Sequence, residues 1–237
     1  MRLTPILFFA LTATLARAQN PNIEQVGAAG QANLNALGTG AAAPVYMGRT
    51  DGVVGNPYVV ARWLSARLVT SSPVPLAPVP LKYDVLNQRL LMRRVGSRDS
   101  LLLDDRLLTG FVLEEPATPT APARERVFRR FTEAPLAPQR AQYVEVLHEG
   151  KYAFLKQHRK VVQKAPVSSG YGADSKTAEL QDQNLYYVRR PDGRLLPVKL
   201  TGKSLLAAAP ELAPVVKAAA PRTEEDWAAA FRNADPR

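Results

Sequence analysis

Between residues 52 and 199, short apolar segments alternate with turn-forming residues. This spacing is typical of antiparallel β proteins, because strands need only a few residues between turns, whereas helices run longer. After residue 200 the spacing of apolar residues changes to that of helices. We therefore expect a mainly β (α+β) fold. Residues 52–200 would form a curled or partly closed antiparallel sheet, and residues 201–237 a tail of short C-terminal helices packed on it.

The clearest predicted hairpin turns at Asn87-Gln88. A two-residue turn there would place Val85 opposite Leu90, and it would gather four apolar side chains on one face of the hairpin. These are Tyr83, Val85, Leu90 and Met92. The opposite face carries Lys82 and Asp84, so we expect it to be half-solvated.

A second hairpin is predicted to turn at Glu149-Gly150, with Val146 opposite Ala153. Apolar side chains then lie on both of its faces, so each face needs a covering layer. A third hairpin is predicted at Pro191-Asp192-Gly193, where proline and glycine favour a tight turn.

The last predicted helix begins after Thr223, a residue type that caps helix N-termini, and its first turn is acidic. Trp227 and Phe231 are four residues apart and therefore share one face of this helix. We expect that face to cover the hairpin formed by residues 143–156.

The N-terminus has the three features of a cleavable signal peptide in the required order. Arg2 precedes an apolar run, and Ala16-Arg17-Ala18 supplies the small residues that signal peptidase recognises. The run is shorter than the about 20 residues of a membrane span. We therefore expect removal of residues 1–18, a mature chain that begins at Gln19 without a transmembrane span, and export to the periplasm or the extracellular space.

Residues 19–51 are rich in Gly, Ala and Asn and almost uncharged, which is typical of a flexible leader. A weak apolar run leaves open the alternative of a helix packed against a partner, although its glycines disfavour a helix. The run consists of Ile23, Val26, Leu34 and Leu37.

The chain is basic, with a formal net charge of +10. A basic surface attracts polyanions such as anionic glycan, lipid or nucleic acid. The densest basic residues are Arg124, Arg126, Arg129 and Arg130, followed by Arg159, Lys160 and Lys164. No nucleic-acid-binding motif accompanies them, so a solvated basic surface is the simpler interpretation and nucleic acid is not an expected partner.

Few groups suited to catalysis are present. The chain has no cysteine, which excludes disulfides, thiolate chemistry and cysteine-ligated metals. In the predicted hairpin the two histidines, His148 and His158, would lie about 23 Å apart at ~3.3 Å per residue, too far to share a metal. His148 is expected to be exposed at the turn. Because no known hydrolase, zinc or nucleotide motif occurs either, we predict no catalytic, cofactor-binding or metal-binding residue.

Several segments together resemble a loose group of uncharacterised exported bacterial proteins. They are Gly55-Asn-Pro-Tyr58 with Trp63, Val79 to Asp84, Tyr143 to Lys151, Tyr186-Tyr187 and Lys203 to Leu206. The resemblance would span residues 55–231. It implies export and a β-then-helix order, and it implies no activity.

Three classes of function are compatible with these features. A non-catalytic envelope protein that binds or scaffolds an envelope protein or glycan agrees best with export, a β-rich surface and the missing catalytic motifs. A polyanion-binding protein is the second class. An enzyme with an unrecognised carboxylate or serine site is the third.

Overall fold

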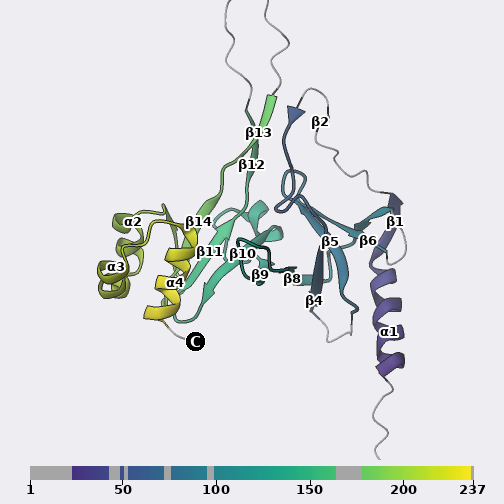
Figure 1. Cartoon of the computed structure of the whole chain (residues 1–237), viewed down its shortest axis with the longest axis horizontal. Helices are drawn as coiled ribbons and strands as arrows, with labels where there is room; N and C mark the ends of the chain where they lie inside the picture. Colours follow the sequence, from purple (N-terminus) through teal and green to yellow (C-terminus); the bar gives the residue numbers. More distant parts are fainter. Residues whose placement is uncertain are drawn as a thin grey trace, which may run out of the picture.

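The computed structural model describes residues 23–42, 49–50, 53–71, 76–94, 99–163 and 178–235. Within these residues, eleven strands form one antiparallel sheet in the order β1-β7-β6-β5-β4-β8-β9-β10-β11-β14-β15 (Figure 1). In chain order they are β1 (Gly38–Ala42), β4 (Leu64–Thr70), β5 (Val79–Asp84), β6 (Arg89–Arg93), β7 (Ser100–Leu103), β8 (Leu108–Glu115), β9 (Arg124–Arg130), β10 (Tyr143–Glu149), β11 (Ala153–Gln157), β14 (Leu185–Arg189) and β15 (Leu195–Val198). The described part of the sheet is curled but not closed, which confirms the predicted fold class.

A smaller sheet stands beside the large one. Its strands are β2 (Arg49–Thr50), β3 (Val53–Val54), β12 (Lys160–Gln163) and β13 (Ala178–Asp182). Strands β13 and β3 are parallel, and the other pairs are antiparallel.

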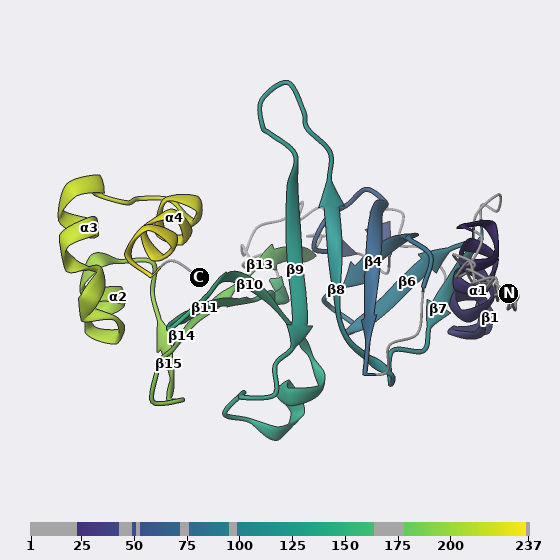
Figure 2. The same ribbon diagram turned by 90° about the horizontal axis from the view of Figure 1, so that it is seen from below.

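The α-helices lie at the two ends of the large sheet (Figure 2). Helix α1 (Ile23–Ala36) is at one end, and α2 (Gly202–Ala208), α3 (Ala213–Ala219) and α4 (Glu224–Ala234) are at the other. Single 3-10 turns occur at Ala137–Ala141 and Pro210–Leu212. Between the helices, the hairpin that joins β8 to β9 projects beyond the sheet.

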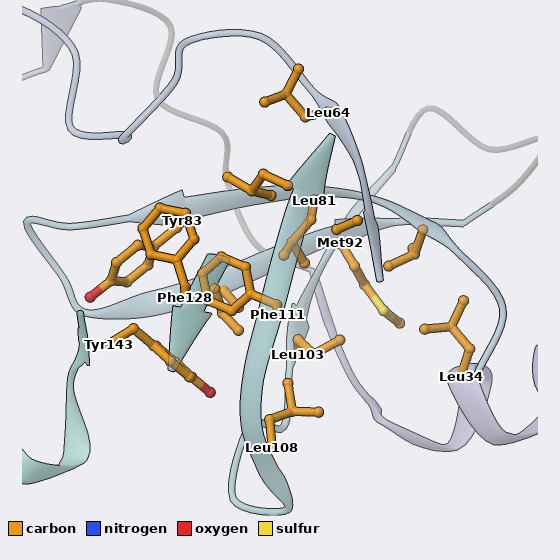
Figure 3. Close-up of a cluster of buried hydrophobic side chains, with 14 of the residues drawn as sticks. Leu34, Leu64, Leu81, Tyr83, Met92, Leu103, Leu108, Phe111, Phe128 and Tyr143 are labelled. Carbon is orange, nitrogen blue, oxygen red and sulfur yellow. The ribbon is translucent and has the colours of Figure 1, made fainter. Parts of the chain in front are cut away.

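Aromatic packing explains the curl. The rings of Tyr83 on β5 and Tyr143 on β10 lie 5.8 Å apart, although β4, β8 and β9 separate their strands in the sheet (Figure 3). Phe111 stacks on Phe128 with ring centroids 4.7 Å apart, and it contacts both tyrosine rings edge-on. The sheet must bend for these rings to meet, so the face that carries them is concave. We call it the inner face.

The hairpin β10–β11 has apolar cover on both faces, as its two apolar faces require. On one side Val144 and Leu155 pack with Phe131 and Tyr187. On the other, Phe154 packs with the helical tail, where its ring stacks on Phe231 at 4.8 Å. The N-terminus of α4 is closed by a reciprocal capping box between Thr223 and Asp226.

The interpretation of residues 19–51 as a flexible leader is corrected for residues 23–42, which form α1 and β1. Leu34 of α1 is 1% exposed in the main core. The backbone carbonyl of Gly30 accepts a hydrogen bond from the Ala77 amide at 3.2 Å, and a Cβ at Gly30 would lie only 3.1 Å from that nitrogen. The glycine that weakens the intrinsic helix propensity therefore permits a close contact that holds the helix.

The predicted registers of two hairpins are wrong by two residues. In the first, Tyr83 rather than Val85 is opposite Leu90, because a four-residue turn at 85–88 replaces the two-residue turn. The Asp84 carboxylate accepts hydrogen bonds from the backbone and side chain of Asn87 and thereby stabilises this wider turn. A shift of two residues preserves the faces, so the predicted core residues are nonetheless buried.

In the second hairpin, Val146 is opposite Leu155 instead of Ala153, and a bulge follows before His148. The bulge absorbs the extra residue near the turn. The third hairpin has its turn at the predicted place, with Gly193 at a φ of 81°.

The face of the first hairpin that was expected to be half-solvated is covered. Lys82 is only 8% exposed, because Tyr58 and Trp63 of the preceding segment lie over it. The Lys82 Nζ atom is 4.5 Å from the centre of the Tyr58 ring. Cation–π attraction offsets part of the cost of this burial.

Candidate functional site

Strand β9 directs alternate side chains to the two faces of the sheet. Phe128 pairs with Glu145 of β10, and both point to the inner face. Because residues two apart in a strand share a face, Arg126 joins them there. The residue between them, Val127, is exposed on the opposite face.

Arg126, Glu145 and His158 form a buried polar cluster on the inner face. The Arg126 Nε and Nη2 atoms donate to the two oxygens of Glu145, each at 2.7 Å. The Nε2 atom of His158 lies 2.6 Å from Glu145 Oε2. All three residues are at most 8% exposed. This two-point Arg–carboxylate geometry is the strong form of an ion pair.

The charge states of the cluster follow from these contacts. Burial by itself would raise the pKa of Glu145, but hydrogen bonds from Arg126 and His158 hold it well below its usual value. Burial lowers the pKa of His158, although its hydrogen bond to Glu145 opposes that change. Because an ionised carboxylate only accepts, the His158 Nε2 atom is the donor in its contact with Glu145.

A second polar link joins the sheet to helix α4. Glu224 in the first turn of α4 lies 2.7 Å from Lys156 Nζ of β11 and accepts a hydrogen bond of 2.6 Å from the Tyr186 hydroxyl of β14. Burial, followed by this bond to Glu224, raises the pKa of Tyr186. Lys156 lies directly opposite Glu145 in the β10–β11 ladder. The buried cluster and this second link therefore form a continuous polar band, which separates the aromatic core from the apolar packing of the tail.

Two pockets open around the base of the β8–β9 hairpin. The larger has a volume of about 610 Å³ and is lined by Trp63 and Ser65 at the start of β4 and by Ala123 on the hairpin. The smaller, of about 240 Å³, lies between β9–β10 and helix α4. Arg124 and Glu125 line both pockets, and as neighbours in β9 they direct their side chains to opposite faces of the sheet. We call the larger pocket the hairpin groove.

Arg124 links the β8–β9 hairpin to helix α4. It pairs with Glu115, the residue opposite it in the hairpin, and its Nη1 atom lies 3.5 Å from Glu225 of α4. The cross-strand pairing of Glu115 with Arg124 around the turn at Pro116–Pro122 is the one signal in the sequence that points to this groove. Trp63 and Arg62, which also line it, could not be linked to it from the sequence.

The predicted basic surface is largely ion-paired within the molecule. Arg126 is buried in the cluster, so it is not a surface residue. Arg129 pairs with Glu133 at 2.6 Å, and Arg130 with Asp105 at 3.2 Å. Lys160 pairs with Asp182 at 2.7 Å. Arg159 is exposed, and Lys164 lies outside the described residues, as do Ala16, Ala18 and Gln19 at the predicted cleavage site.

His148 is buried rather than exposed at a turn, which corrects the expectation. It is 1% exposed, its ring lies against Phe231, and its Nε2 atom is 3.2 Å from Asp235 Oδ2. The same carboxylate oxygen accepts a 2.7 Å hydrogen bond from the Tyr152 amide. His148 therefore fastens the end of α4 to the β10–β11 turn.

Among the described residues, no group of three or more His, Asp and Glu side chains could hold a metal ion. The described helices include none that is both long enough and apolar enough to cross a membrane. Comparison with protein-family models, with curated proteins and with solved structures finds no match to this chain.

Proposed function

We propose that this protein is exported to the cell envelope and binds a ligand in the hairpin groove without catalysing a reaction. The observation that carries the proposal is the groove itself. Its volume falls in the size range of about 300–1,000 Å³ that ligand sites occupy, and it combines the Trp63 ring with charged side chains.

The buried cluster of Arg126, Glu145 and His158 supports binding rather than catalysis. Both oxygens of Glu145 accept hydrogen bonds within the protein, and its lowered pKa makes it a weak base. Among the described residues that line the groove there is no histidine to activate the Ser65 hydroxyl. The cluster is better suited to fixing the strands that carry the groove.

Export carries its own prediction. The protein recovered from its source organism is expected to begin at Gln19, because signal peptidase would cut after Ala18. Intact-mass measurement of the purified protein tests this. Recovery of the unprocessed chain in the membrane fraction would contradict export with cleavage.

The groove is tested by filling it. Ala123 lines the larger pocket and is exposed, so Ala123→Trp should occupy the pocket without removing a charge or a core side chain. Binding of the purified protein to washed cell envelopes from the source organism is expected to weaken at least about tenfold, equivalent to about 1.4 kcal/mol. Co-sedimentation over a range of protein concentrations measures it.

The matched control is Ala117→Trp, which places the same side chain at an exposed position of the same hairpin, outside the groove. This variant should bind envelopes as the native protein does. If Ala123→Trp also binds with native affinity, the groove is not the binding site and the proposed function fails.

A further inference from the structure

We infer that the ligand of the hairpin groove is a neutral oligosaccharide. The inference rests on the proposed function and names its ligand class. It follows from three properties of the groove: its charge balance, the chemistry of its polar groups and the position of Trp63.

The groove is electrically balanced in a chain whose formal charge is +10. Two arginines and three glutamates line it. Arg67, which pairs with Glu114 and Glu125, brings the sum of formal charges to zero. A polyanion would meet the carboxylates here, and a polycation would meet the guanidinium groups. Neither class of ligand is matched by this groove.

The polar groups suit a ligand rich in hydroxyls. A guanidinium only donates hydrogen bonds, an ionised carboxylate only accepts them, and a hydroxyl does both. In the groove Arg67 lies between Glu114 of β8 and Glu125 of β9 and donates a hydrogen bond to each. The Glu125 side chain is 58% exposed and can accept from a ligand hydroxyl while still paired with Arg67.

Trp63 supplies an apolar surface beside these groups. The guanidinium carbon of Arg93 lies 4.5 Å from the centre of its ring, and Lys82 Nζ lies 5.2 Å from it. Both cations project from the β5–β6 pair and hold the indole in place against that part of the sheet. The half-buried ring also lines the larger pocket, next to Leu64 and Pro116. A sugar presents apolar C–H groups on its ring faces and hydroxyls at its rim, which matches an aromatic wall flanked by charged groups.

Fluorescence titration tests this inference with defined probes. The neutral probes are cellohexaose, maltohexaose and chitohexaose, and the charged probes are a heparin hexasaccharide and hexalysine. The chain has two tryptophans, and Trp227 is buried in the tail packing, so a ligand-induced change reports on Trp63. We expect at least one neutral hexasaccharide to bind, with an affinity unchanged between low and high salt because screening acts only on charges.

Two groove variants and one control locate the site. Trp63→Leu should weaken sugar binding at least tenfold, as measured by calorimetry. Because Trp63 also packs in a small core, Glu125→Gln provides a second variant at an exposed side chain, and it should weaken binding about threefold or more without loss of folding. Arg106→Ala changes an exposed arginine that pairs with Asp104 outside the groove, and it should bind as the native protein does.

Three results would overturn the inference: no binding of any neutral hexasaccharide, tighter binding of heparin or hexalysine in a salt-dependent manner, or native sugar affinity in both groove variants. These outcomes are distinct from failure of the proposed function, which is decided by envelope binding of Ala123→Trp. If a charged probe binds and Ala123→Trp abolishes its binding, the groove remains a binding site and only the ligand class is wrong.

Discussion

Replacing Trp227 with alanine is expected to lower the free energy of unfolding by about 3–5 kcal/mol, the range for emptying a large buried aromatic site. Trp227 is 2% exposed and packs in one cluster with Phe154 of β11 and Phe231 of α4. Its loss would leave a cavity between the helical tail and the sheet. The tail has no disulfide to hold it, because the chain lacks cysteine. Thermal and denaturant unfolding measure the effect.

Trp227→Phe is the matched control for this prediction. The indole Nε1 atom is buried without a hydrogen-bond partner among the described residues, so phenylalanine removes volume but no hydrogen bond. The loss should therefore be clearly smaller than for alanine. An unchanged midpoint for Trp227→Ala would show instead that the tail contributes little to the core and leaves this face available to a partner.

The faces of the strands could be predicted from the sequence, but their registers could not. Side chains alternate with a period of two, so the assignment of Tyr83 and Leu90 to the core survives a two-residue error. The register itself depends on the Asp84 carboxylate, which bonds to Asn87 and widens the turn. That contact is local, yet nothing in the apolar pattern indicates it.

The ordered N-terminal segment and the buried cluster depend on tertiary contacts. Helix α1 has a glycine-rich sequence and is held by Leu34 in the core, not by its propensity. Arg126, Glu145 and His158 are far apart in the chain and meet only because β9, β10 and β11 are neighbours in the sheet. Sequence reasoning placed Arg126 on the surface, since it could weigh the local charge density but not the partner across the strand.

Replacing Arg126 with methionine is expected to lower the free energy of unfolding by about 3–5 kcal/mol at pH 7, because it leaves the Glu145 carboxylate buried without its counter-charge. Methionine retains much of the volume, so the loss measures charge rather than packing. The double variant Arg126→Met/Glu145→Leu removes both charges and should recover a large part of the stability. If the double variant is no more stable than Arg126→Met, the cost arises from packing and not from the stranded carboxylate.

The pH dependence separates these explanations further. In the native protein the folded-state pKa values of both Glu145 and His158 are lowered. Their contributions to the free energy of unfolding are therefore fully present above the pKa values of the unfolded chain, about 6.5 for histidine and about 4.3 for glutamate, and are lost as the pH falls below each of them.

In Arg126→Met, Glu145 lacks the main donor that lowers its pKa, while burial still raises it, so the folded protein takes up a proton at higher pH than the unfolded chain does. Protonation of Glu145 at low pH then removes the buried charge that has no counter-charge. We expect the difference in unfolding free energy between native protein and Arg126→Met to be smaller at pH 4 than at pH 7, as measured by urea unfolding at both values. A difference that stays constant over this range would mean that Glu145 is not the group on which the Arg126 side chain acts.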